Sequence, residues 1–61
     1  MLEMIRPQIL KQEGMSLYQE QRFLDSAESF RSARSDLEVA GERSTAAEMA
    51  NNCSVAFLQA R

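Results

Sequence analysis

Residues 12–19 read Gln-Glu-Gly-Met-Ser-Leu-Tyr-Gln, and residues 52–59 read Asn-Cys-Ser-Val-Ala-Phe-Leu-Gln. At a separation of forty positions, amide matches amide, small matches small, and apolar matches apolar. Self-similarity with a period of about twenty to fifty residues is typical of helical repeats, in which each unit buries its apolar face against its neighbours. We therefore predict an all-α chain that holds one two-helix repeat and the first helix of the next.

Glycine, proline and apolar periodicity divide the chain into three predicted helices. The first is expected over about 7–21, because Pro7 suits a first helical turn, where its missing N–H would have no partner. The second is expected over about 23–40, and Gly41 suits the left-handed position after its end. The third is expected over about 45–60, because Thr45 and Glu48 have capping-box spacing.

Steps of three and four along each helix predict which residues are buried. Gly14 lies inside the first helix and indicates that another helix backbone passes close by. The predicted apolar stripes are Ile9, Leu10, Leu17 and Tyr18 on the first helix, then Phe23, Ala27, Phe30, Ala33 or Arg34, Leu37 and Ala40 on the second, and Ala46, Met49, Ala50, Cys53, Phe57 and Ala60 on the third.

Length and composition limit the class of protein. The 61 residues fit one small domain, and a domain of this size buries only roughly 60% of its unfolded surface, so its stability should be marginal. Nine acidic and seven basic residues are interspersed and give a net charge of −2, which argues against a nucleic-acid partner. No apolar run reaches the ~20 residues of a membrane span, and the first residues lack a signal-peptide pattern. A cytoplasmic or otherwise reducing location is expected.

Residues for catalysis and metal binding are scarce. The chain has no histidine, so the usual general base near neutral pH is absent. Its serines lack the G-x-S-x-G or S-x-x-K context of an activated nucleophile. Cys53 alone provides no zinc ligand set, and there is no Gly-rich phosphate loop. We expect no enzymatic activity, no cofactor and no metal, and we expect Cys53 to pack as a small apolar residue.

The spacing of the small and aromatic residues resembles that of the tetratricopeptide repeat. Its pattern has a small and a large apolar residue in the first helix, then an aromatic, a small residue, an aromatic and an alanine in the second. The matching residues are Gly14, Leu17, Phe23, Ser26, Phe30 and Ala33, with Ser54 and Phe57 in the second copy. Residues 51–57, Asn-Asn-Cys-Ser-Val-Ala-Phe, resemble the Asn-Asn-Leu-Gly-x-x-Tyr stretch of the subclass with a forty-residue period.

The resemblance covers about 7–61 and departs from the family at Glu13, where an apolar residue is common, and at Glu38, where a proline is common. It implies an antiparallel helical hairpin plus a third helix, as a fragment of a right-handed α-solenoid. It also implies a protein-interaction scaffold, because first helices of successive repeats in this family line a concave groove that holds a peptide or partner helix.

The resemblance places the partner-binding residues on the first and third helices. Asparagine and glutamine side chains both donate and accept hydrogen bonds, so they can pair with any peptide backbone. Lys11 and Asn52 also match the carboxylate clamp of chaperone-binding repeats, but Met15 replaces an asparagine of that clamp. The predicted partner-binding residues are Lys11, Gln12, Met15, Tyr18, Asn51, Asn52, Val55 and Gln59, and Gln8, Gln19, Glu48 and Leu58 share their spacing.

The uncovered face of the third helix allows alternatives to a peptide-binding scaffold. The third helix has no following helix in the sequence up to Arg61. Its uncovered face therefore predicts either a longer natural chain or self-association as a homodimer or stacked array. A free-standing three-helix bundle, resembling the domains that bind helical tails of membrane-remodelling proteins, would have a similar shape.

Overall fold

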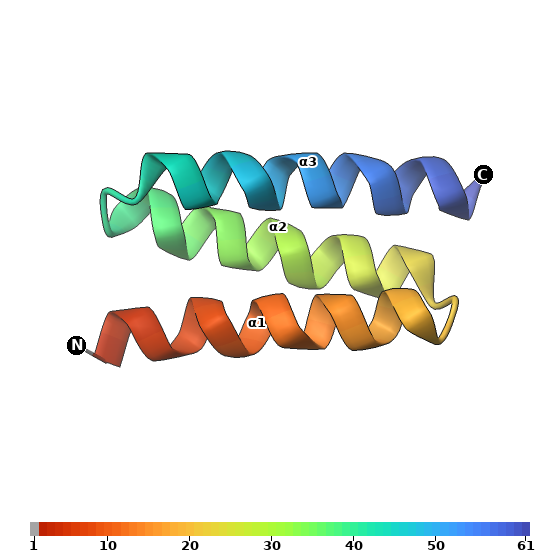
Figure 1. Cartoon of the computed structure of the whole chain (residues 1–61), viewed down its shortest axis with the longest axis horizontal. Coiled ribbons are helices and arrows are strands. Elements are labelled where there is room, and N and C mark those ends of the chain that lie inside the picture. Colours follow the sequence, from red (N-terminus) through yellow and green to blue (C-terminus); the bar gives the residue numbers. More distant parts are fainter. Residues whose placement is uncertain (1) are drawn as a thin grey trace.

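The computed structural model describes the backbone of residues 2–61 and the side chains from Ile5 onward. Over these residues it contains three helices and no strands (Figure 1): α1 spans Leu2–Gln19, α2 spans Phe23–Val39, and α3 spans Arg43–Ala60. α1 and α3 run in the same direction, and α2 runs between them in the opposite direction. The all-α prediction is therefore confirmed for the described residues.

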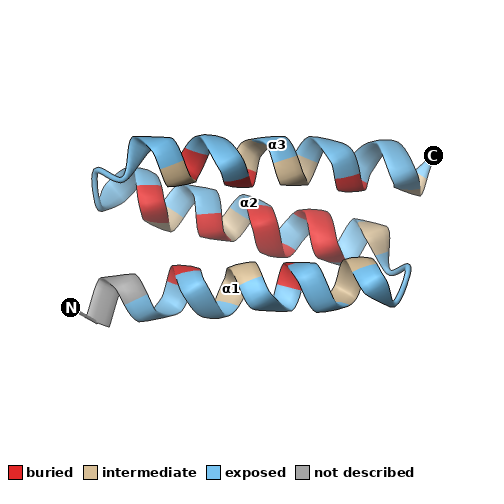
Figure 2. Cartoon of the chain, viewed as in Figure 1, coloured by how far each residue is buried: buried red, intermediate tan, exposed pale blue. Residues whose placement is uncertain are grey.

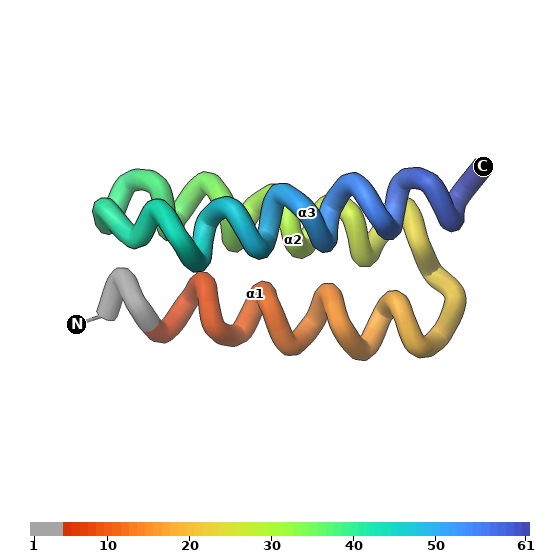
Figure 3. Tube along the Cα trace, turned by 45° about the horizontal axis from the view of Figure 1, so that its top comes forward, coloured from red at the N-terminus to blue at the C-terminus, as the bar shows by residue number. Residues whose placement is uncertain are grey.

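α2 packs against both of the other helices, whereas α1 and α3 barely touch each other. In the turned view of Figure 3, α2 lies behind α3. α2 is therefore set back from the plane through α1 and α3. The Cα atoms extend over 34 × 17 × 12 Å. The arrangement is a flat stack of two hairpins that share α2, and it leaves an open side between α1 and α3.

The turn between α1 and α2 is tight, as the closely spaced bounds of the first two predicted helices implied. Gln21 adopts a left-handed conformation with a φ of 64°. Its N–H donates to the carbonyl of Tyr18 at 3.0 Å, and the N–H of Arg22 donates to the carbonyl of Leu17 at 2.9 Å. These paired bonds satisfy the last carbonyls of a helix and stop it. α1 therefore ends at Gln19, two residues before the predicted end.

The turn between α2 and α3 has the same design. Gly41 takes the left-handed position with a φ of 81°, as its place in the sequence predicted. Its N–H donates to the carbonyl of Glu38 at 3.1 Å, and the N–H of Glu42 donates to the carbonyl of Leu37 at 2.9 Å. The two turns are thus equivalent in bonding, although only the second has glycine at the position with positive φ.

The start of α1 differs from the prediction. The helix begins at Leu2 and contains Pro7 in its interior. A proline there removes one backbone hydrogen bond and crowds the preceding turn. Pro7 is among the most completely buried side chains of the described residues. Its packing therefore offsets part of this cost, and the helix continues through it.

The start of α3 also differs. The helix begins at Arg43, and Glu42 occupies the N-cap position without a side-chain cap hydrogen bond. The predicted capping box of Thr45 and Glu48 is wrong, because the turn at Gly41 returns the chain to helical geometry two residues before Thr45. The N–H of Ala46 already donates to the carbonyl of Glu42 at 3.0 Å.

The core lies along α2, the helix with a neighbour on each side (Figure 2). Ala33 and Met49 have no exposed surface, and Phe30 is 3% exposed. Cys53 is half-buried against this cluster, as its place on the apolar stripe predicted. The core cluster consists of Phe30, Ala33, Leu37, Ala46 and Met49, with Leu10 and Cys53 packed against it.

Three residues predicted to be buried are exposed. Ile9 is 52% exposed and Phe57 is 54% exposed, while Ala40 lies beyond the end of α2 as its C-cap. Near the end of α3 the buried position is Ala56, the neighbour of Phe57. For Ile9 and Phe57 the reason is that α1 and α3 each have α2 on one side only, so only part of each apolar face is covered.

Gly14 is a close contact point between α1 and α2. A Cβ added there would lie 2.9 Å from both Cε1 and Cζ of Phe30. The buried hydroxyl of Ser26 donates a hydrogen bond to the Gly14 carbonyl, with an Oγ–O distance of 2.7 Å. The predicted close approach of another helix is therefore real: α2 passes Gly14 closely, and the atoms nearest to an added Cβ belong to the ring of Phe30.

Candidate functional site

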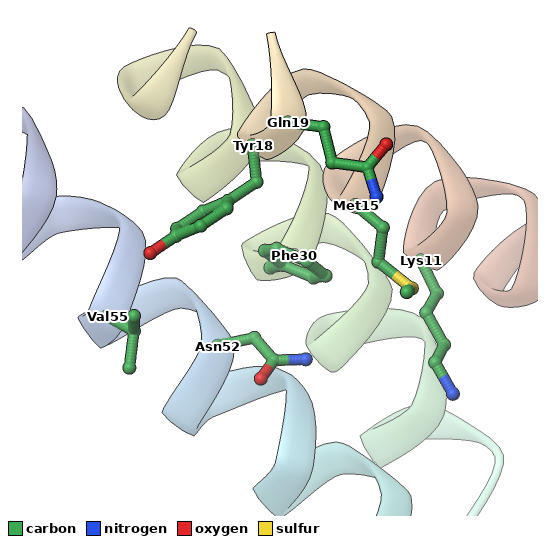
Figure 4. A pocket seen from close by; sticks show the side chains of 7 residues that line it. All are labelled: Lys11, Met15, Tyr18, Gln19, Phe30, Asn52 and Val55. Atoms are coloured by element: carbon green, nitrogen blue, oxygen red, sulfur yellow. The ribbon is translucent and has the colours of Figure 1, made fainter. Parts of the chain in front are cut away.

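An open groove lies between α1 and α3 on the side away from the bulk of α2 (Figure 4). Its volume is about 460 Å³. All three helices contribute to it, because α2 supplies the floor and the two outer helices supply the walls. The lining residues are Lys11, Met15, Tyr18 and Gln19 from α1, Phe30 from α2, and Asn52 and Val55 from α3.

Phe30 forms the floor because Gly14 has no side chain. The ring of Phe30 lies against Gly14, which places it at the centre of the groove between the side chains of α1 and those of α3 (Figure 4). A larger residue at position 14 would displace the ring. The smallest residue of α1 therefore determines the shape of the groove.

The walls come from residues at helical spacing. Lys11, Met15 and Tyr18 follow one another at steps of four and three on α1, so they share one face. Asn52 and Val55 are three apart on α3 and also share one face. Because α1 and α3 run in the same direction, these two rows face each other across Phe30.

The groove has apolar walls and a few polar groups. Met15 is 49% exposed and Val55 is 39% exposed, so both offer apolar surface to a ligand. Lys11, Gln19 and Asn52 supply hydrogen-bonding groups, and Lys11 also supplies a positive charge. A concave apolar surface with a small number of polar groups is the usual composition of a binding site.

The position of Tyr18 is fixed by a second aromatic residue. The rings of Tyr18 and Phe23 have centroids 5.1 Å apart and an interplanar angle of 72°, which is an edge-to-face contact. Such pairs contribute roughly 0.5–1.5 kcal/mol beyond their buried area. In Figure 4 the Tyr18 hydroxyl points from α1 toward α3, which places a hydrogen-bonding group at one end of the groove.

The groove continues past Lys11 and Met15 into a second depression of about 580 Å³. This depression follows α1 toward its N-terminal half and reaches the start of α3. Lys11 and Met15 line both depressions, so the two depressions adjoin along α1. The additional lining residues are Pro7, Gln8, Gln12, Leu37, Glu42 and Thr45.

The predicted partner-binding residues are distributed as follows. Gln12 lies beside the groove and lines the second depression and a smaller one on α1. Asn51 and Gln59 are exposed and do not line the groove. The sequence predicts Phe30 only as a core residue. The signal for its place in the groove is Gly14, because the absence of a side chain there leaves room for the ring. Gln19, which shares the predicted spacing, lines the groove, and so do five of the eight predicted partner-binding residues, namely Lys11, Met15, Tyr18, Asn52 and Val55.

Other kinds of site receive no support from the described part of the chain. Within it, no group of three or more histidine, cysteine, aspartate or glutamate side chains is placed to hold a metal ion. None of the described helices combines the length and apolar character needed to cross a membrane. No protein-family model, curated protein or solved structure is significantly similar to the chain.

Proposed function

We propose that this chain is a protein-interaction module, related in design to the tetratricopeptide repeat, that holds an extended peptide or a partner helix in the groove between α1 and α3. The observation that carries the proposal is the position of the two similar segments. Residues 12–19 and 52–59 lie on helices that run in the same direction, and both contribute side chains to one groove.

The direct packing of α2 on both neighbours supports this arrangement over a closed three-helix bundle. In a closed bundle, α1 and α3 would pack against each other and fill the space between them. Here they barely touch, and the space between them is the groove. The contact pattern of each helix with its sequence neighbours is the one that helical repeats have.

The chemistry of the groove favours a ligand with three features. An apolar side chain would pack over Phe30 between Met15 and Val55. The backbone of the ligand would form hydrogen bonds with the side-chain amide of Asn52, which can both donate and accept. An acidic group would lie near Lys11. The chain would then act by binding and not by catalysis, in a cytoplasmic or otherwise reducing compartment that keeps Cys53 as a thiol.

The test is a selection of random twelve-residue peptides displayed on phage, with the whole chain as the immobilised target. Enriched peptides are synthesised with a fluorophore, and their dissociation constants are measured by fluorescence anisotropy. Asn52→Ala should weaken binding about two- to tenfold, the effect of one hydrogen bond. Helicity, measured by circular dichroism, should not change.

Asn51→Ala is the matched control. It removes the same side chain from the adjacent, exposed position outside the groove, so affinity for the selected peptides should stay at the wild-type value. Equal affinities for the wild-type chain and the Asn52→Ala variant, or equal losses for the two variants, would refute the assignment of the groove.

A further inference from the structure

One face of α3 is the sequence equivalent of a covered face of α1. Residues 47, 50, 54 and 57 lie forty positions after residues 7, 10, 14 and 17. On α1 these positions are buried or half-buried, and α2 packs there against Gly14 through Phe30. On α3 the same positions are exposed or half-buried, and Phe57 is 54% exposed. We call the set Arg43, Ala47, Ala50, Ser54, Phe57 and Arg61 the α3 outer face.

α1 also has an exposed face, on which two isoleucines alternate with acidic and polar residues. Ile5 is 54% exposed and Ile9 is 52% exposed, and steps of three and four place them on one face with three other exposed residues. We call the set Ile5, Ile9, Glu13, Ser16 and Glu20 the α1 outer face. Figure 2 shows exposed residues along the outer edges of both α1 and α3, at opposite sides of the molecule.

The two outer faces are complementary in charge. The α3 outer face has Arg43 and Arg61 at its two ends, and the α1 outer face has Glu13 and Glu20. Opposite charges across an interface favour the correct partner, whereas like charges act against it. Two α3 outer faces placed together in antiparallel orientation about residue 52 would bring Arg43 of one copy to Arg61 of the other, which is unfavourable.

The two faces can also be placed so that large residues lie opposite small ones. Because α1 and α3 run in the same direction on opposite sides of α2, a second copy displaced without rotation would place its α1 alongside α3. If the two helices are placed in a register that offsets their residue numbers by forty-one, the large Ile9 lies at the level of the small Ala50, and the large Phe57 lies at the level of the small Ser16. Glu20 would lie at the level of Arg61. Each large residue thus meets a small one.

We propose that the α3 outer face binds the α1 outer face of a second copy of this chain. The contact is heterologous, since it joins two different surfaces, and copies added in this way form an open stack and not a closed dimer. The interface does not use the residues that line the groove between α1 and α3. Stacking therefore goes beyond the proposed peptide binding, and either property can fail without the other.

Two variants, mixed, test the proposal. Phe57→Glu places a negative charge on the α3 outer face, and Ile9→Lys places a positive charge on the α1 outer face. Both residues are more than half exposed, so neither change disturbs the core. By sedimentation velocity, the wild-type chain should form species larger than a dimer as its concentration increases. Each variant alone should stay at the monomer mass of 6.9 kDa.

A one-to-one mixture of the two variants should form a heterodimer of twice the monomer mass and nothing larger. Ile9→Lys keeps an intact α3 outer face and Phe57→Glu keeps an intact α1 outer face, so one interface is restored. Leu24→Lys and Val39→Glu are matched controls, at α2 positions that are 60% and 88% exposed. Both controls should stack like the wild-type chain.

Three results would overturn the proposal. The first is a wild-type chain that stays monomeric at the highest accessible concentration. The second is an Ile9→Lys variant that still dimerises, which would indicate pairing of two α3 outer faces. The third is a mixture that remains monomeric. Circular dichroism checks that each variant is folded, and Ala47→Glu and Ile5→Lys replace any variant that is not.

Discussion

Replacement of Gly14 by alanine is expected to destabilise the protein, against the intrinsic preference of a helix for alanine. The added Cβ would lie 2.9 Å from two carbons of the Phe30 ring and 3.0 Å from a third. The ring is rigid, and Phe30 is only 3% exposed, so the contact is not relieved by a small shift of a flexible side-chain end. Either the ring or the helix must move.

The expected change in the free energy of unfolding is the difference of two terms. Alanine in a helix interior is favoured over glycine by about 1 kcal/mol. Overpacking of a filled core costs roughly 1–3 kcal/mol. With the centre of this range, Gly14→Ala should lower the free energy of unfolding by about 1 kcal/mol. That is a large fraction of the roughly 3–9 kcal/mol expected for a chain of 61 residues.

The assay is urea denaturation followed by far-ultraviolet circular dichroism. Gln12, which is exposed on the same helix, provides the control pair. There Gln12→Ala should be more stable than Gln12→Gly by about 1 kcal/mol, because only the helix preference acts. In a Phe30→Leu background, which removes the ring, Gly14→Ala should no longer destabilise, so the double-mutant cycle should show coupling between the two positions.

A Gly14→Ala variant that is more stable than the wild-type chain by the same amount as the Gln12 pair would refute the reasoning. It would mean that the Phe30 ring tolerates the added Cβ without cost. The groove would then not depend on the absence of a side chain at position 14.

Two further predictions concern single residues described above. Gln21→Gly should raise the free energy of unfolding by about 1 kcal/mol, because glycine adopts the φ of 64° without the steric cost of a side chain. At the equivalent turn after α2, Gly41→Ala should lower the free energy of unfolding by a similar amount, as measured by thermal unfolding. Ser26→Ala should cost about 1 kcal/mol, since it removes the buried hydrogen bond to the Gly14 carbonyl. A Ser26→Ala variant as stable as the wild-type chain in urea would show that this bond contributes nothing net.

The second helix was the easiest part of the fold to predict from sequence. α2 has a neighbour on each side, so its buried face is wide and its apolar residues follow the helical period closely. Ala27, Phe30, Ala33 and Leu37 are all buried as their spacing predicted. The left-handed residue after its end was also predictable, because glycine at position 41 is the residue that adopts this conformation most readily.

The outer helices were harder, for a physical reason. Each has α2 on one side only, and periodicity identifies an apolar face without showing which part of it a neighbour covers. Ile9 and Phe57 belong to apolar faces that remain exposed. The start of α1 was missed because Pro7 favours a first turn on propensity, and tertiary packing of its ring overrides that preference.

The groove could be predicted in part. Lys11, Met15 and Tyr18 were identified from their spacing on one helix, and all three line the groove. On α3 the rotation of the helix about its axis decides which amide enters the groove, and adjacent residues differ by about 100°. Asn52 therefore lies inside the groove and Asn51 outside it. Helical spacing alone does not distinguish these two neighbours.

The sharing of α2 by two hairpins has a consequence for how the chain folds. Nearly every tertiary contact joins helices that are consecutive in the sequence, so only short loops must close before packing begins. Chains with such local topology fold in microseconds to milliseconds. Either hairpin can nucleate first, with α2 as the common template onto which the remaining helix then docks.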